Sequence, residues 1–125
     1  MIAALYRRVK NVLQGKPSTK RSPQWETVRK KHIVEEAVCQ SCGRTEKLEV
    51  HHIMPFHLYP VKELDDSNLI TLCEVDTECH FNVGHHRNWK SFNPNVRADA
   101  VANTNALKSK GMYPSKPGQS NFPKL

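Results

Sequence analysis

The amino-acid sequence predicts a small α+β domain in which a β-hairpin lies between flanking helices and a structural zinc ion supplements the core. Two short apolar segments have the length and composition of strands, and helical patterns precede and follow them. The chain has 125 residues, of which 38% are hydrophobic and 7% aromatic, so a single domain with a small core is expected. The four cysteines offer the additional stabilisation that such a core needs.

Residues 1–21 are expected to form a basic N-terminal helix followed by a linker. Apolar side chains recur near helical spacing in residues 1–14, and Gly15 and Pro17 end this pattern. The linker carries three cations, which are Lys16, Lys20 and Arg21. The main domain is therefore expected to span residues 22–97.

A long helix is predicted at the start of this domain, from about Pro23 to Val38. Ser22 suits the N-cap position and Pro23 the first helical position. The side chains expected to face the core are Trp25, Val28, His32 or Ile33, and Ala37. A tight turn follows over Cys39-Gln-Ser-Cys42-Gly43, in which the glycine suits a left-handed backbone conformation.

The strands of the hairpin are predicted at Leu48–Ile53 and Asn68–Leu72, and a long loop, residues 54–67, joins them. Another helix is expected from Cys79 or His80, although Gly84 weakens it. Residues 98–125 are rich in Ala, Asn, Ser, Lys and Pro. They predict a partly disordered C-terminal tail with a short helix around residues 98–107.

The cysteine spacing predicts one structural zinc site formed by Cys39, Cys42, Cys73 and Cys79. Two residues between thiolates is a common zinc half-site, whereas a disulfide between the first two cysteines would close a very short loop. The second pair is separated by Glu74–Glu78, where a shorter spacing is usual. This insertion can bulge outward without moving the ligands. His80 could also replace Cys79 as the fourth ligand, and this alternative stays open.

The net charge of +7 is typical of a small domain that binds a polyanion, although charge alone fits a ribosome-associated or simply soluble basic protein equally well. The histidines described below favour DNA as the partner. The candidate phosphate contacts are Arg29, Lys30, Arg44, Arg87 and Lys90. Each of these cations could equally belong to a solvated surface. The N-terminus lacks the apolar stretch of a signal peptide, and no segment reaches membrane-spanning length. We therefore expect a cytoplasmic protein in a reducing, intracellular compartment, with no membrane partner.

Among the seven histidines, the adjacent pair His51-His52 and the later His80 indicate catalysis rather than packing. Phosphodiester cleavage needs a base that takes a proton from water and a cation that stabilises the developing charge. His51 and His80 are the candidate metal ligands, and His52 is the candidate base. Neighbouring residues on an ideal strand face opposite sides. Both histidines can therefore serve one site only if the strand ends or distorts at His52.

In combination, these residues resemble the HNH endonucleases, which have a ββα-metal fold, and in particular their zinc-bearing branch and small phage and prophage members. The resemblance spans about residues 22–96. Its motifs are His51-His52-Ile53-x-Pro55, Asn68-Leu69-x-x-Leu72-Cys73 and Cys79-His80. It implies that His51 and His80 hold a catalytic metal and that His52 activates water. It also implies that Asn68 orients the loop that bears the base.

The widened spacing before Cys79 leaves the register of the last helix open, so His85 is a second candidate metal ligand. A histidine at the strand position favours Mn²⁺, Ni²⁺, Co²⁺ or Zn²⁺ over Mg²⁺ as the catalytic metal. We therefore expect Mn²⁺ to support the cleavage reaction better than Mg²⁺ does.

The leading hypothesis is a metal-dependent DNA endonuclease that nicks DNA or cuts both strands and is a monomer or a weak dimer. One alternative is a non-catalytic, zinc-stabilised module that binds nucleic acid. Another is a nuclease subunit of a phage DNA-packaging machine, whose partners would include other phage or host DNA-processing proteins. The His51-His52 pair and Asn68 favour the endonuclease, because a pure binding module has no need for them.

Overall fold

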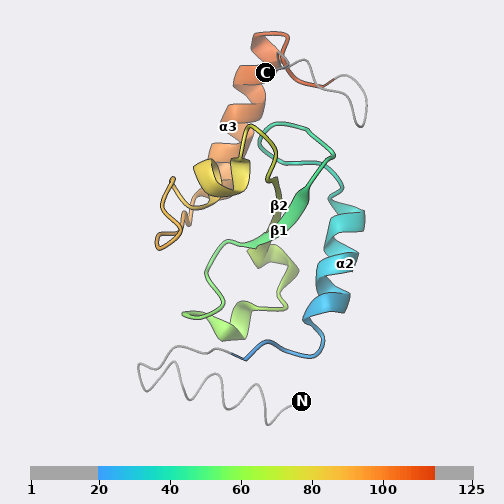
Figure 1. Cartoon of the computed structure of the whole chain (residues 1–125), viewed down its shortest axis with the longest axis vertical. Coiled ribbons are helices and arrows are strands. Elements are labelled where there is room, and N and C mark those ends of the chain that lie inside the picture. The colour runs from blue at the N-terminus through green and yellow to red at the C-terminus, as the bar shows by residue number, and fades with distance from the viewer. Residues whose placement is uncertain (1–19, 115–125) are drawn as a thin grey trace.

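The computed structural model describes residues 20–114 as helical layers on either side of a two-stranded sheet (Figure 1). Helix α2 (Trp25–Glu35) covers one side of the hairpin formed by β1 (Leu48–His52) and β2 (Leu69–Cys73). The short turn η3 (His80–Gly84) and helix α3 (Val96–Ser109) lie on the other side. The predicted α+β class is confirmed. None of the helices in the described range is long and apolar enough to cross a membrane.

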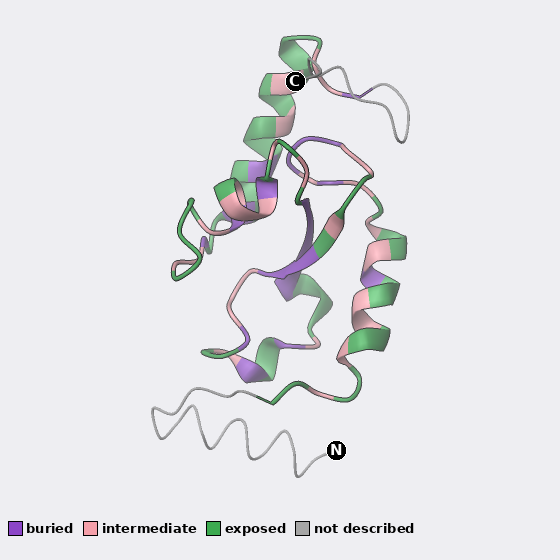
Figure 2. Cartoon of the chain, viewed as in Figure 1, coloured by how far each residue is buried: buried purple, intermediate pink, exposed green. Residues whose placement is uncertain are grey.

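The hairpin is antiparallel, with Leu48 opposite Cys73 and His52 opposite Leu69. Every residue of β2 is buried, because this strand lies between the helical layers (Figure 2). Side chains alternate between the two faces of β1, so His51 contacts His80 of η3 whereas His52 contacts α2. The strand ends at His52, as one site for both histidines requires, yet the two rings still point to opposite faces.

Helix α2 is shorter than predicted, beginning at Trp25 and ending at Glu35. Its buried residue is His32, whose two ring nitrogens lie 2.8 Å from Asp66 Oδ1 and 3.1 Å from Glu36 Oε1. The expectation that Ala37 faces the core is wrong, because the helix ends before this residue and leaves it exposed. The loop between the strands contains two 3₁₀ turns, Pro60–Lys62 and Asp66–Asn68.

Helix α3 packs into the core, with Val96 and Ala100 buried against the cysteines. Asn103 Nδ2 donates a hydrogen bond to Ser41 Oγ over 2.7 Å, which ties α3 to the turn that carries the first two cysteines. The expected division of the chain after residue 97 falls inside this helix. The helix predicted around residues 98–107 is therefore longer than expected and belongs to the folded domain.

Gly43 adopts the predicted left-handed conformation, with φ of +81°. A Cβ atom at this position would lie 2.6 Å from the ring of Tyr113, so glycine is also required for the close approach of the chain after α3. The helix predicted in residues 1–14 and the tail segment 115–125 lie outside the described residues.

Candidate active site

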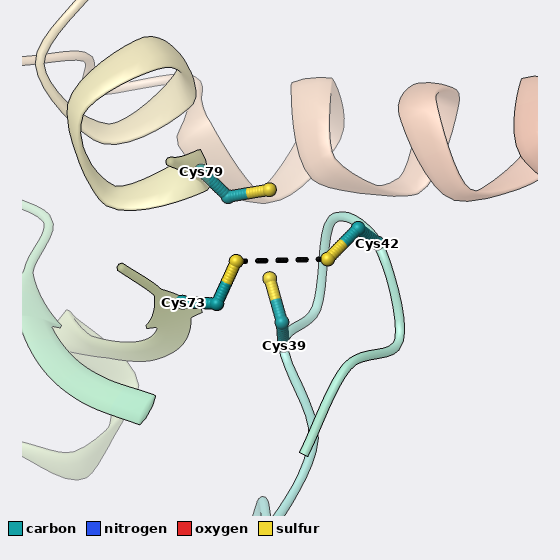
Figure 3. A group of neighbouring side chains, drawn as sticks. All are labelled: Cys39, Cys42, Cys73 and Cys79. Carbon is teal, nitrogen blue, oxygen red and sulfur yellow. Dashed lines mark hydrogen bonds between the residues drawn. The ribbon is translucent and has the colours of Figure 1, made fainter. Parts of the chain in front are cut away.

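The four cysteines converge between β2, η3 and the tight turn after α2 (Figure 3). All four side chains are buried, and their sulfur atoms lie within 4.8 Å of one another. They are free thiols rather than disulfides. The cluster predicted from the spacing therefore forms, with Cys79 rather than His80 as its fourth member.

The sulfur positions fit a tetrahedral zinc site. A Zn–S bond of about 2.3 Å places two thiolates of a tetrahedron about 3.8 Å apart. The sulfurs of Cys42 and Cys73 lie 3.6 Å apart, well beyond a disulfide bond length of about 2.05 Å. Four buried thiolates and no further open position are the donor set of a structural zinc site.

The charges of the cysteine cluster also indicate a cation. Hydrogen bonding with Cys39 lowers the pKa of Cys42 to about 7, and the same kind of contact lowers the pKa of Cys73. Hydrogen bonding with Cys42 raises the pKa of Cys39, and that with Cys39 raises the pKa of Cys79. Buried thiols in mutual contact thus cannot all ionise, because neighbouring thiolates repel one another. A divalent cation removes this restriction by neutralising the charge.

The insertion Glu74–Glu78 folds back onto both groups of candidate ligands. Thr77 Oγ1 lies 3.2 Å from Cys73 Sγ, where its hydroxyl can donate to a thiolate. Glu74 accepts a hydrogen bond from His80 Nδ1 over 2.9 Å. The insertion therefore orients ligands of two sites instead of only bulging away from them.

Three histidines form a second cluster on the face of the hairpin covered by η3. His51 lies on β1, His80 begins η3 and His85 follows it, and their ligand nitrogens are within 4.8 Å of one another. His51 Nδ1 and His80 Nε2 are 3.0 Å apart. The two candidates for the later ligand, His80 and His85, therefore do not exclude each other, because the fold brings both to His51.

The geometry of η3 explains how histidines five positions apart can meet. The turn is π-helical, and its i to i+5 pattern places His80 and His85 on one side, where a regular α-helix would separate them. Gly84 lets this turn pack against β1, since a Cβ atom there would lie 3.2 Å from His51 Cε1. The sequence predicted a helix weakened by Gly84, and the glycine instead serves this close contact.

Hydrogen bonds orient the rings of two cluster histidines. The Glu74 carboxylate accepts from His80 Nδ1, and the backbone carbonyl of Ser91 accepts from His85 Nδ1 over 2.8 Å. A neutral imidazole that donates through Nδ1 keeps a lone pair on Nε2. Both rings are therefore held in the tautomer that offers Nε2 to a metal.

Burial favours the neutral form of two cluster histidines, His51 and His85. It lowers the pKa of His51 to about 3, with a smaller effect from the charges that His80, His85 and His52 would carry. Burial also lowers the pKa of His85. Within the part of the chain that the structure describes, the buried Nε2 of His51 has no hydrogen-bond partner. Neutral imidazoles are the form that binds divalent metals. The three rings fit a divalent metal, which three protein ligands would leave with open coordination positions.

His52 lies outside this cluster, on the α2 face of the hairpin. Its ring packs against Trp25 at a centroid distance of 4.4 Å, and its Nε2 donates to the Glu63 carbonyl over 2.9 Å. This hydrogen bond fixes the tautomer and leaves Nδ1 as the nitrogen that can accept a proton. Burial lowers the pKa of His52 to about 4, so the ring is neutral at pH 7.

Asn68 holds the loop that receives the His52 hydrogen bond. Its Oδ1 accepts from the Met54 backbone N–H over 2.9 Å, and its Nδ2 donates to the Met54 carbonyl over 3.1 Å and to the Lys62 carbonyl over 3.2 Å. Lys62 directly precedes Glu63, whose carbonyl binds His52. The Asn68 amide therefore connects both ends of the loop segment on which the orientation of His52 depends.

The predicted DNA-contacting cations occupy different environments. Arg44 pairs with Asp76, and its side chain is only 11% exposed, so its charge is directed at the insertion Glu74–Glu78. Arg29 lies on α2 and pairs with Glu26 over 3.4 Å. The exposed members of the set are Lys30, Arg87 and Lys90.

The fold brings two ligand clusters together in a small domain, in which a β-hairpin and the following turn place three histidines where they could hold a metal ion. Residues 39–86 match the family model described as HNH endonuclease. Searches of curated proteins and of solved structures found no significant match.

Several contacts of the site could not be read from the local sequence. Glu74 lies in the insertion that the cysteine spacing singled out, but its hydrogen bond to His80 depends on how the insertion folds. The partners of His52 and His85 are the backbone carbonyls of Glu63 and Ser91, which any residue type could supply. Spacing alone therefore identifies the ligands and not the groups that orient them.

Proposed function

We propose that this protein is a metal-dependent DNA endonuclease with His52 as the general base and His51, His80 and His85 as ligands of one catalytic divalent metal. The observation that carries the proposal is a cluster of three histidines, together with His52 beside His51 in the chain, whose Nδ1 can accept a proton. A module that only binds nucleic acid needs neither feature.

His52 removes the proton from the attacking water. Its Nε2–H is held by the Glu63 carbonyl, so the proton is taken up at Nδ1. The water oxygen then bonds to phosphorus, and the bond from phosphorus to the 3′ oxygen breaks. The positive charge formed on His52 is stabilised by the same carbonyl and by the phosphate of the substrate.

His51, His80 and His85 would hold the metal on the η3 face of β1. When bound, it would supply Lewis-acid stabilisation of the charge that develops on the scissile phosphate and the leaving oxygen. Since β1 ends at His52, we place the scissile phosphate across the end of this strand, between the metal ligands on one face and His52 on the other. Asn68 supports this arrangement by keeping the loop beside His52 in place.

The DNA backbone is held by the exposed cations Lys30, Arg87 and Lys90 together with Arg29, and the net charge of +7 favours this contact. Arg44 is not proposed to contact the DNA directly, because it already pairs with Asp76. Its role is to hold the chain after the Cys39–Gly43 turn against the insertion Glu74–Glu78. One such site cleaves one strand at a time, so a monomer nicks DNA.

Mn²⁺ supports this reaction better than Mg²⁺. The histidine cluster found among residues 20–114 contains three imidazoles and no carboxylate, and imidazole is a poor ligand for Mg²⁺. Nicking assays over a metal titration test this preference, and a clear advantage of Mg²⁺ would reject it.

Cleavage of supercoiled plasmid tests the proposed function. The wild-type protein should nick the plasmid with Mn²⁺ and stop on addition of EDTA, and His52→Ala should be slower by about 10² to 10⁴ fold. His57→Ala replaces an exposed loop histidine and should retain the wild-type rate. Undiminished cleavage by His52→Ala would rule out this base. A wild-type protein that binds the plasmid but cuts it with none of these metals would favour the binding module.

A further inference from the structure

Trp89 exposes a large aromatic surface beside the histidine cluster. Its side chain is 58% exposed, although its ring centroid lies 4.9 Å from that of His85 and 5.3 Å from that of His80. Part of the indole therefore packs on the site while the rest stands in water. An exposed indole in this position is available for a further stacking contact.

The loop around Trp89 is held by its own hydrogen bonds. Ser91 Oγ donates to the carbonyl of Asn88 over 3.0 Å, and the Lys90 backbone N–H donates to Asn88 Oδ1 over 3.0 Å. His86 and Arg87 have positive φ angles of 51° and 63°, which non-glycine residues adopt only when the surrounding structure requires it. Trp89 is thus presented by a constrained loop, which lowers the entropy lost when a ligand stacks on it.

A cavity of about 300 Å³ adjoins the indole, and its lining combines aromatic rings with carboxylates. The lining residues are Cys73, Glu74, Glu78, Phe81 and Trp89. The rings of Phe81 and Trp89 pack together at a centroid distance of 4.9 Å. A flat aromatic ligand can stack against such a wall, and the carboxylates accept hydrogen bonds from its N–H groups while repelling phosphate.

We propose that this pocket binds one unstacked nucleobase of the nucleic-acid substrate, an inference that rests on the proposed nuclease function. The base stacks on Trp89 and donates its exocyclic amino group to Glu78. Glu74 is committed to His80, which leaves Glu78 as the available acceptor. Adenine, cytosine and guanine carry such an amino group, whereas thymine and uracil present a carbonyl oxygen in its place. The flanking Arg87 and Lys90 are exposed and can contact the adjoining phosphates.

With this pocket, the protein recognises whether the nucleic acid near the cleaved bond is base-paired. A base enters it only after leaving the helical stack, which costs free energy in an intact duplex and less at a single-stranded or mispaired position. The protein should therefore prefer nucleic acid that has an unpaired, amino-bearing base near the cleaved bond.

The test compares oligonucleotides of deoxycytidine and deoxyuridine, whose bases differ in the amino group and the adjoining ring nitrogen. Binding is measured with zinc-loaded His52→Ala protein and no added catalytic metal, by anisotropy of the labelled strand and by tryptophan fluorescence. The cytosine strand should bind several-fold tighter and quench the fluorescence of Trp89. Trp89→Phe, which retains Trp25, gives the reference signal.

Variants separate stacking from amino-group recognition. Trp89→Ala should weaken binding of both strands by about tenfold, whereas Trp89→Phe keeps most of the affinity. Glu78→Gln should reduce the difference between the cytosine and uracil strands, since an amide can also donate to a carbonyl oxygen. Val101→Ala is the matched control, because Val101 is also 58% exposed but lies on α3, and it should change nothing.

Equal affinity of the wild-type pocket for the two strands would overturn amino-group recognition, and unchanged binding by Trp89→Ala would overturn stacking. Thermal unfolding and zinc content show whether Trp89→Ala is folded. If Trp89→Ala is unfolded, two other measurements decide. The inference is overturned when nucleic acid does not quench the fluorescence of Trp89 and Glu78→Gln keeps the full preference for the cytosine strand. All these measurements are of binding, so a wild-type protein that fails to cleave would contradict the endonuclease proposal alone.

Discussion

The cysteine cluster and the histidine cluster both use the hairpin and the turn η3 but differ in burial and in the number of ligands. All four cysteines are buried, so a zinc ion there would be enclosed. The histidine cluster has three ligands, and His80 is 17% exposed at its edge, whereas His51 is only 4% exposed. Four enclosed thiolates suit a structural ion, while three imidazoles with one open side suit an ion that must meet a substrate.

The two sites meet at one peptide bond. Cys79 and His80 are neighbours in the chain, yet Cys79 turns toward the other thiols and His80 toward His51. The insertion before them contributes to both, with Thr77 near the thiolates and Glu74 bonded to His80. Zinc binding should therefore set the position of η3, on which the arrangement of the histidine cluster depends.

The largest difference between the clusters is expected when a ligand of each is removed. Cys79→Ser should lose zinc and with it the folded state, because zinc contributes on the order of 10 kcal/mol in small domains that depend on it. Zinc content and circular dichroism on heating measure this loss. His85→Ala is the comparison and should retain both zinc and a cooperative transition. Cooperative unfolding of Cys79→Ser at the wild-type temperature would show that the cysteine cluster is dispensable for stability.

His80→Ala should separate catalysis from folding. The variant keeps the cysteines but loses one of three ligands, so we expect plasmid cleavage to fall by roughly a thousandfold while zinc content stays at the wild-type level. Mn²⁺ titration followed by calorimetry should show correspondingly weaker binding. Cleavage at the wild-type rate would mean that His51 and His85 suffice.

Glu74→Gln should have a smaller effect on the same site. The amide lacks the negative charge that makes His80 a better ligand, and loss of such partners weakens metal binding by about 10 to 100 fold. Calorimetry with Mn²⁺ measures this change, and the absorption spectrum of bound Co²⁺ reports on the altered geometry. Glu46→Gln, at an exposed position, should match the wild type. If Glu74→Gln and Glu46→Gln bound Mn²⁺ with equal affinity, Glu74 would have no positioning role.

The smallest expected effect is on stability in mild acid. The pKa of His52 is lowered from 6.5 to about 4 in the folded protein, so the unfolded chain binds more protons between these values. This contribution to stability is complete above pH 6.5 and is lost as pH falls toward 4. Between pH 7.5 and 5.5 the loss is about 1.4 kcal/mol. Urea unfolding of wild type and His52→Gln at both pH values isolates this ring, and equal pH dependence would contradict the assignment.

Much of the candidate site could be predicted from spacing, because metal ligands recur at short intervals that local turns define. The two Cys pairs, His51 and His80 are of this kind, and the tight turn with Gly43 formed as expected. The packing of α3 could not be predicted in the same way, since its low apolar content resembles that of a tail. Its attachment depends on Val96, Ala100 and Asn103 meeting residues far away in the chain.

The sequence by itself determined the donor set of each cluster and the class of domain, because the type of a side chain decides which metal it can bind. The tertiary structure decided that Cys79 and His80 serve different clusters and that His80 and His85 share one. It also decided that His51 and His52 face opposite sides of β1 and which nitrogen of each oriented ring carries the proton. These features depend on packing across the hairpin and on hydrogen bonds to distant carbonyl and carboxylate groups, which local spacing does not specify.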